Sequence, residues 1–239
     1  MSRAVRICLV GASGLLGSAL IQACVGRAGV RLTAVSRREL DLPPGARMEV
    51  LLADPANWDD AIAAARPDVV VCALGTTWAR AGKDEVAFRA VDQQLVLDCA
   101  KWGIEAGARQ FIFVSSIGAD AAAKGLYLRV KGEVENSLAK SGYARLDIVR
   151  PGLLLGPRNE RRVLERIGQI VAPVVDRLLL GGLSRWRSIK AETLAEAILA
   201  LAQVKVRGRF VHEHEALLRA IRRRALEASV KAAMSAAVD

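Results

Sequence analysis

Short apolar runs alternate with longer amphipathic segments through the first two thirds of the chain. The apolar runs have strand length and favour β-branched residues, whereas apolar positions in the intervening segments recur at helical spacing. The predicted strands are residues 5–10, 30–36, 48–53, 68–74, 110–115 and 144–149. The predicted helices are a segment that ends near Cys24 and residues 56–65, 87–106 and 126–140. Because parallel neighbours need crossover helices, this order predicts an α/β fold with a doubly wound parallel sheet.

The pattern weakens after Leu153. The last third predicts a helix over 158–175, a loop from 181, a helix over 191–204, a strand over 209–212 and a terminal helix over 215–237. No repeat or linker marks a boundary. We therefore expect a single domain over residues 1–239, in which residues 153–239 contribute the substrate pocket.

A glycine-rich turn, GASGLLG at 11–17, joins the first strand to the first helix. Gly11 turns the chain off the strand, Gly14 lets backbone N–H groups approach a pyrophosphate, and Gly17 lets the helix pack closely on the sheet. The helix N-terminus favours the phosphates, with Ser13 and Leu15 as further contacts. The turn therefore predicts a dinucleotide site, although a tight strand-to-helix turn also accounts for it.

The end of the second strand selects the dinucleotide. An acidic residue there holds the ribose 2′-hydroxyl of NAD, whereas arginine accommodates the 2′-phosphate of NADP. This chain reads Ser36-Arg37-Arg38. We therefore predict NADP rather than NAD, unless the two arginines are simply exposed loop residues.

Three further positions are predicted to contact the cofactor. Asp54 follows the third strand, where it either contacts the adenine amino group or caps the next helix. Leu74 and Gly75 follow the fourth strand, and the small residues there leave room for a ligand at the carboxyl edge of the sheet.

Tyr127 and Lys131 are the candidate reactive pair. They are four residues apart on a predicted helix and so share one face. A neighbouring ammonium favours a phenolate, which suits acid/base chemistry, and Lys131 can also bind the nicotinamide ribose. Ser116, after the fifth strand, is predicted to bind the substrate oxygen. Ser115 competes for that role, because strand alternation lets only one of them face the site.

The chain of 239 residues has a net charge of +10, which attracts phosphate-bearing ligands, nucleic acid or anionic membranes. Aromatic residues make up only 4%, too few for an obvious base-stacking platform. Positive charge is concentrated only at Arg219 and at residues 222–224, which we interpret as the solvated face of the terminal helix. Nucleic acid is therefore an unlikely partner.

The four cysteines are scattered and contain no Cys-x-x-Cys pair, which favours free thiols in a reducing compartment. The first strand starts almost at once, and no apolar run is long enough to cross a bilayer. These features predict a cytoplasmic protein with no secretory signal and no membrane partner.

A few polar residues of the last third have two interpretations. His212 and His214 share a face if extended, but no third metal ligand is near, so we expect surface positions and no metal. Arg158, Arg185 and Arg187 either bind an anionic group of a substrate or are solvated. Trp186 is a candidate wall of the pocket.

The combined motifs resemble the short-chain dehydrogenase/reductase superfamily, of the atypical or extended type. The resemblance rests on GASGLLG at 11–17, CALGTT at 72–77, FVSSIGAD at 113–120, LYLRVKGEVE at 126–135 and RPG at 150–152. It is strongest to the Tat-interacting oxidoreductase-like group and extends to epimerase/dehydratase-like proteins.

The resemblance implies a Rossmann fold with a small C-terminal substrate-binding extension, a possible homodimer and NADP-linked oxidoreduction. The catalytic residues carried over are Ser116, Tyr127 and Lys131. The cofactor-binding residues carried over are Gly11, Gly14, Gly17, Arg37, Arg38 and Asp54.

Two departures limit the resemblance. Ala73-Leu74-Gly75 replaces the Asn-Asn-Ala-Gly of short-chain members, so their asparagine-assisted proton relay is not supported. The tail is also shorter than in sugar-nucleotide epimerases, which makes a nucleotide-sugar substrate less favoured.

The leading hypothesis is an NADP-dependent oxidoreductase that acts on a small carbonyl or hydroxyl compound. The alternatives are an NADPH-sensing regulatory protein without turnover, and nucleic-acid binding through the basic tail. An intact Tyr127 and Lys131 argue against a pure sensor.

Overall fold

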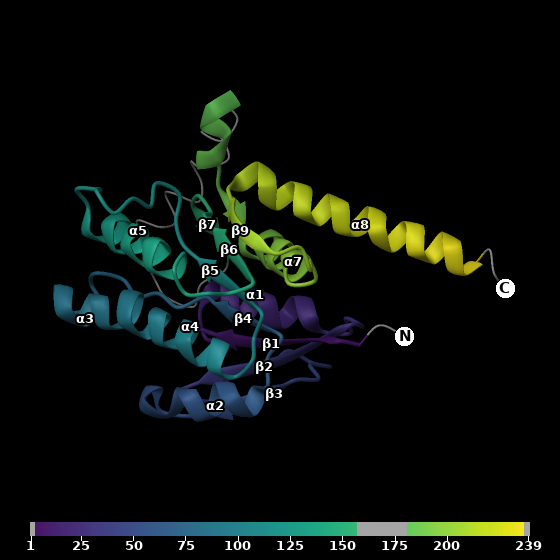
Figure 1. Ribbon diagram of the computed structural model, residues 1–239, viewed down its shortest axis with the longest axis horizontal. Coiled ribbons are helices and arrows are strands. Elements are labelled where there is room, and N and C mark those ends of the chain that lie inside the picture. Colours follow the sequence, from purple (N-terminus) through teal and green to yellow (C-terminus); the bar gives the residue numbers. More distant parts are fainter. Residues whose placement is uncertain (1–2, 157–180, 237–239) are drawn as a thin grey trace.

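The computed structural model describes residues 3–156 and 181–236 and is built around one seven-stranded parallel sheet (Figure 1). The strand order is β3-β2-β1-β4-β5-β6-β9, and every neighbouring pair is parallel. The strands are β1 (Val5–Val10), β2 (Val30–Ser36), β3 (Glu49–Leu52), β4 (Val69–Cys72), β5 (Gln110–Val114), β6 (Arg145–Val149) and β9 (Gly208–His212). The predicted doubly wound α/β fold of Rossmann type is confirmed.

Helices cover both faces of this sheet. They are α1 (Leu15–Cys24), α2 (Trp58–Ala65), α3 (Glu85–Arg89), α4 (Leu95–Glu105), α5 (Leu126–Leu138), α7 (Ala191–Leu201) and α8 (His214–Ala236). In Figure 1, α2, α4 and α5 lie on one side of the sheet and α1 and α7 on the other. The far end of α8 extends beyond the body of the molecule.

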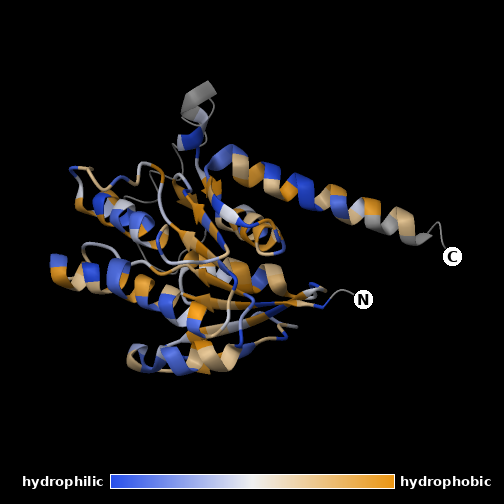
Figure 2. Cartoon of the chain, viewed as in Figure 1, coloured by the Kyte–Doolittle hydropathy of each residue, from blue (hydrophilic) through white to orange (hydrophobic). Residues whose placement is uncertain are grey.

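The alternation of side chains along the strands creates two separate cores. Ile7 and Leu9 of β1 face the core shared with α1, α7 and the start of α8, whereas Cys8 and Val10 face the core shared with α2, α4 and α5. All four residues of β4 are buried, as expected for a central strand covered on both faces. Figure 2 shows the strands as the most continuous hydrophobic part of the chain.

Several elements differ from the prediction. The helix predicted over 87–106 is divided into α3, a π-helical segment η2 (Ala90–Gln94) and α4. The loop predicted from 181 is a 3₁₀ helix, η3 (Gly181–Trp186), and the helix predicted near 56 starts with a 3₁₀ turn, η1 (Pro55–Asn57). A small second sheet pairs β7 (Leu154–Leu155) with β8 (Ile189–Lys190). The helix predicted over 158–175 lies outside the described residues.

The described helices include none that is long and apolar enough to cross a membrane.

All seven strands point the same way, so their carboxyl ends share one edge of the sheet. The segments after β1, β2, β4 and β5, which contain most of the predicted site residues, therefore meet at this edge.

Candidate cofactor and active site

The glycine turn after β1 is packed so closely that only glycine fits at two of its positions. Gly11 has a φ of +89°, and a Cβ there would lie 2.6 Å from the carbonyl of Ala73 after β4. A Cβ on Gly17 would lie 2.4 Å from the carbonyl oxygen of Gly11. Gly11 thus lets the turn pack against the end of β4, and Gly17 lets the first turn of α1 pack against the backbone of Gly11 and Ala12.

Gly14 differs, because its side-chain position is open. A Cβ there would come no closer than 3.4 Å to another atom, the carbonyl oxygen of Gly11. Gly14 is the N-cap of α1, no side chain caps that end, and the first turn holds no acidic residue. Ser13 and Gly14 are exposed, and Leu15 is half-buried. Gly14 donates its own N–H to the carbonyl oxygen of Gly11 at 3.2 Å, and no side chain caps the N-terminus of α1, an arrangement that suits a phosphate.

The end of β2 presents two exposed arginines. Ser36 donates its hydroxyl to the carbonyl oxygen of Arg38 at 2.7 Å, which closes the turn and leaves Arg37 and Arg38 on the surface. After β3, the carboxylate of Asp54 accepts from the backbone N–H of Ala56 at 3.0 Å and caps η1. Asp54 thus caps a helix, which was one of its two predicted roles. A contact between Asp54 and the adenine stays a prediction.

The segment after β4 brings Leu74 and the exposed Gly75 to the same edge. The next residue, Thr76, donates its backbone N–H to Asp92 Oδ2 at 2.6 Å. The other oxygen, Asp92 Oδ1, lies 3.1 Å from Lys131 Nζ. Asp92 belongs to η2 and is completely buried. A charged pair thus underlies the loop that is predicted to contact the cofactor.

Tyr127 and Lys131 share a face of α5, as predicted, but at different depths. The Lys131 side chain is 3% exposed, and its ammonium lies 5.9 Å from the centre of the Tyr127 ring. The same ammonium lies 5.0 Å from the ring of Phe113 in β5. Tyr127 is 44% exposed and packs edge-on against Phe88 of α3. The phenol is therefore accessible to a ligand, above a buried cation.

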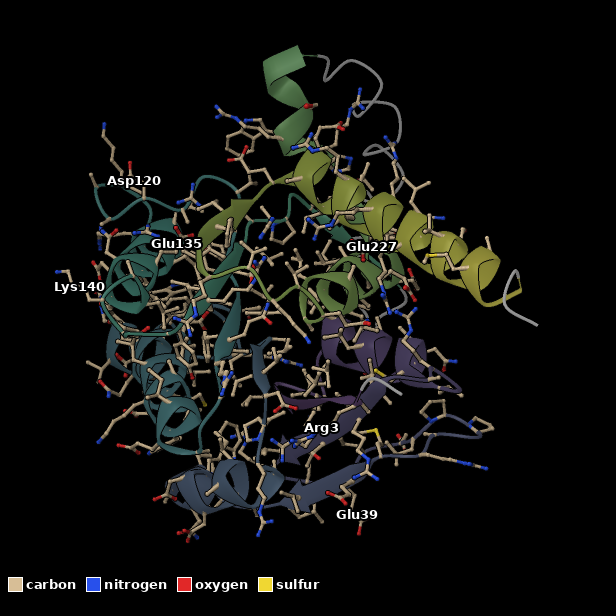
Figure 3. The ribbon with its side chains drawn as sticks, turned by 45° about the vertical axis from the view of Figure 1, so that its right-hand side comes forward. Arg3, Glu39, Asp120, Glu135, Lys140 and Glu227 are labelled. Atoms are coloured by element: carbon tan, nitrogen blue, oxygen red, sulfur yellow. The ribbon has the colours of Figure 1, made fainter. Side chains whose placement is uncertain are left out.

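The two serines after β5 have different partners. Ser115 is buried and donates to Glu135 Oε1 at 2.5 Å, and Glu135 also accepts from Arg150 at 2.5 and 3.0 Å. Figure 3 labels Glu135 on α5. Ser116 is half-buried, and its hydroxyl donates to the carbonyl oxygen of Ile117 at 3.2 Å. Ser115 is thus held in an ion-paired cluster, and the substrate role of Ser116 stays a prediction.

Asp92 is the residue of this site that the sequence reasoning missed. The sequence does contain a sign that Asp92 is buried. It occupies one of four positions that follow each other at intervals of four and are all buried in the structure: Phe88, Asp92, Val96 and Ala100. A carboxylate at a core position of a helix needs a partner, because burying an unpaired charge is costly. That partner, Lys131, is far away in the sequence.

The two histidines are not surface residues, so this expectation was wrong. His212 Nε2 lies 2.8 Å from Asp147 Oδ1, because β9 pairs with β6 and so brings His212 beside the buried Asp147. His214 is buried at the start of α8. In the described part of the chain no group of three or more His, Cys, Asp or Glu residues is arranged to hold a metal.

The other candidate substrate-binding residues of the last third lie near the carboxyl edge of the sheet or outside the described residues. Trp186 packs over Gly118 after β5, where an added Cβ would lie 3.1 Å from the indole. Arg185 is exposed, with its guanidinium 5.9 Å from the Trp186 ring, and Arg187 is half-buried. Arg158 lies outside the described residues. A substrate role for these residues stays a prediction.

Comparison with known proteins gives one family match. A family model described as NAD(P)H-binding matches residues 11–203. "Protein FMP52, mitochondrial" of Candida albicans is 32% identical over 206 residues, which are 84% of this chain and 89% of that protein. "Protein HTATIP2" of Rattus norvegicus is 37% identical over 158 residues, which are 64% of each chain.

Solved structures share the fold. UDP-glucose 4-epimerase from Brucella ovis in complex with NAD has a TM-score of 0.66 and 15% identity, covering 87% of this chain and 76% of that one. A putative NAD-dependent epimerase/dehydratase from Bacillus halodurans has a TM-score of 0.62 and 21% identity, covering 86% of this chain and 92% of that one.

The expectation of a cytoplasmic protein is contradicted by these relatives. The fungal proteins at about 30% identity, including those of Emericella nidulans and Candida albicans, are named as mitochondrial. That expectation rested on four scattered cysteines without a Cys-x-x-Cys pair and on an apolar strand pattern that starts at residue 5. Neither feature distinguishes one reducing compartment from another, which is why the inference failed.

Proposed function

Because the chain belongs to the NAD(P)H-binding family, we propose that it is an NADP-dependent oxidoreductase of the short-chain dehydrogenase/reductase type. Its substrate is a small carbonyl or hydroxyl compound. The observation that carries the proposal is the accessible Tyr127 phenol above the buried Lys131 ammonium, at the carboxyl edge that also holds the glycine turn.

The residues present fit a dinucleotide. The uncapped N-terminus of α1, with the open position at Gly14, would hold the pyrophosphate. Lys131 would hold the nicotinamide ribose, and Leu74 and Gly75 would line the same edge. When bound, the cofactor supplies or accepts a hydride at the substrate carbon.

The preference for NADP rests on charge. Arg37 and Arg38 are exposed directly after β2, and Ser36 occupies the strand end where an acidic residue would bind the 2′-hydroxyl of NAD. Two guanidinium groups there favour a 2′-phosphate, because arginine matches phosphate geometry with paired donors.

Three side chains divide the work on the substrate. Ser116, with its hydroxyl outside the Glu135 cluster, donates to the substrate oxygen and holds the carbonyl. Tyr127 gives its phenolic proton to that oxygen during reduction and takes it back during oxidation. Lys131, with its ammonium 5.9 Å from the centre of the Tyr127 ring, would bind the nicotinamide ribose next to the phenol. We assign one wall of the substrate side to Trp186, which packs over Gly118 after β5.

The decisive experiment compares the only two tyrosines of the chain. Purified protein is screened for oxidation of NADPH with a panel of aldehydes and ketones, and Tyr127→Phe is then measured on the active compounds. Loss of a proton donor predicts turnover lowered by about 10²–10⁴-fold with NADPH binding retained.

Tyr143→Phe is the matched control. Tyr143 is mostly buried and donates to the carbonyl oxygen of Ala100 at 2.7 Å, so its loss affects stability and leaves turnover intact. NADPH binding without any turnover on the panel would favour a cofactor sensor instead. Turnover that survives in Tyr127→Phe would refute the assigned role of Tyr127.

The cofactor preference has its own test. Calorimetric titration of the Arg37→Ala/Arg38→Ala variant is expected to show weakened NADPH binding and unchanged NADH binding. An equal effect on both cofactors would contradict recognition of the 2′-phosphate.

A further inference from the structure

We propose that Asp92 is a positioning residue, whose buried carboxylate fixes the Lys131 ammonium where the nicotinamide ribose binds. The inference deepens the proposed function and rests on it, because the ribose contact of Lys131 is part of that proposal. Asp92 itself is completely buried. It acts through Lys131 and through the backbone after β4.

The contacts of Asp92 join three segments of the chain. From η2, its Oδ2 accepts the backbone N–H of Thr76 at 2.6 Å, and its Oδ1 lies 3.1 Å from the ammonium of Lys131 on α5. A Cβ added to Gly75 would lie 3.6 Å from Oδ1, so the carboxylate sits directly beneath the predicted cofactor contact. One carboxylate therefore sets the spacing between the β4 loop and the lysine.

The local helix geometry supports a functional role. Asp92 lies in the π-helical segment, and π-bulges inside α-helices occur frequently at functional sites. The π segment contacts α5, which carries Lys131.

The chemistry of the pair points the same way. Asp92 is 0% exposed and Lys131 is 3% exposed, and a buried ion pair is weak evidence for stability because desolvation offsets the attraction. Oδ1 of Asp92 has no hydrogen bond of good geometry, and the ammonium rests against the rings of Phe113 and Tyr127. A lysine has three donors, so this ammonium keeps donors for a ligand while Asp92 holds its position.

Another buried aspartate provides a contrast. Asp147 is equally buried, but its oxygens accept from Gln110, from two nitrogens of Arg145 and from His212. Its polar atoms are thus satisfied within the protein. Asp147 is the matched control for a buried aspartate whose role is structural.

The test is a double-mutant cycle on NADPH affinity, measured by calorimetric titration without any substrate. Asp92→Asn keeps the shape and an acceptor for the Thr76 N–H but removes the charge that holds the ammonium. NADPH affinity is expected to fall about tenfold, the effect of losing one charge-assisted hydrogen bond. Lys131→Met lowers affinity by itself, and adding Asp92→Asn to it is expected to have no further effect.

Two control variants separate positioning from general destabilisation. Asp147→Asn is expected to lower the thermal midpoint while leaving NADPH affinity unchanged. Glu133→Gln, which removes a partly exposed carboxylate from α5, changes neither property substantially. If Asp92→Asn does not fold, the double variant Asp92→Asn/Lys131→Met lacks the unpaired buried charge and is compared directly with Lys131→Met.

The outcomes are distinguishable. Unchanged affinity in Asp92→Asn, or an additional loss of affinity when it is combined with Lys131→Met, overturns the positioning role alone. Tight NADPH binding with no turnover on the carbonyl panel overturns the proposed function and leaves the cycle readable. Failure of the unmodified protein to bind either NADPH or NADH overturns both.

Discussion

Replacing Gly14 by alanine tests the cofactor turn most directly, because a methyl group at this position has room in the protein. The backbone of Gly14 has φ −81° and ψ 168°, which alanine adopts freely, and the nearest atom to the added Cβ lies at 3.4 Å. In Gly17→Ala, by contrast, the methyl group would lie 2.4 Å from a backbone oxygen and distort the turn itself. Only Gly14→Ala therefore separates binding from folding.

The effect on stability is expected to be small. Alanine at an N-cap is about 0.5–1 kcal/mol worse than glycine. Alanine also lowers the conformational entropy of the unfolded chain, which stabilises the folded protein by about 0.4–1 kcal/mol. The two contributions nearly cancel, and a residual of about 0.5 kcal/mol shifts the thermal midpoint by only about 1–2 °C in a domain of this size.

The effect on binding is expected to be large. The new methyl group would lie at the uncapped start of α1, where it is expected to keep a phosphate from at least one backbone N–H. A hydrogen bond to a charged group contributes about 1.5–3 kcal/mol, so NADPH affinity is expected to fall about ten- to a hundredfold. Calorimetric titration measures the affinity, and thermal denaturation confirms the fold.

Gly125→Ala is the matched control. Gly125 is the N-cap of α5, with φ −76° and ψ 129°, no side-chain cap and no atom within 4 Å of an added Cβ. It is expected to show the same small change in stability and normal NADPH affinity. The reasoning is refuted if Gly14→Ala binds NADPH as tightly as the unmodified protein, or if Gly125→Ala weakens binding equally.

Three further predictions concern stability and reactivity. Glu135→Gln leaves Arg150 without its carboxylate and is expected to lower the free energy of unfolding by about 3 kcal/mol in chemical denaturation. Glu133→Gln removes the partly exposed pair with Arg89 and is expected to cost less than about 1 kcal/mol, so equal losses would contradict this. The hydrogen bond from Arg6 lowers the pKa of Asp68. The ionised Asp68 therefore contributes to stability above its unfolded pKa of about 3.9, and this contribution is lost as the pH falls through the folded pKa. Asp68→Asn should flatten the acid denaturation profile, and an identical profile would refute the linkage. Burial raises the pKa of Cys8 to about 12 and that of Cys72 to about 11. Neither thiol should therefore react with an alkylating reagent at neutral pH until denaturant is added. Alkylation of either cysteine in the folded protein, detected by mass spectrometry, would contradict this.

The strands could be predicted from the sequence because each is a local pattern. Residues 5–10 and 30–36 coincide with β1 and β2, and glycine spacing alone located the turn between β1 and α1. The spacing of Tyr127 and Lys131 likewise predicted a shared helix face. It did not predict that one side chain is buried and the other exposed, because depth depends on what α3 and β5 place around them.

The features that were missed depend on partners far apart in the sequence. Alternation predicted that only one of Ser115 and Ser116 faces the site, but it could not predict that Glu135, from another element, binds the hydroxyl of Ser115. His212 was predicted at the surface because nothing local indicates that β9 extends the sheet beside Asp147. The π segment that carries Asp92 is also invisible locally, since residues 87–106 have an ordinary helical pattern.

The first helix, α1, is covered by an element that is synthesised much later. Leu16, Leu20 and Ile21 of α1 pack in one core with α7, which begins only at Ala191 (Figure 1). During synthesis on the ribosome, the earliest helix therefore emerges long before the segment that shields it. A nascent chain that ends before residue 191 has its complete glycine turn but exposes this apolar surface of α1, so we expect chaperones to bind it.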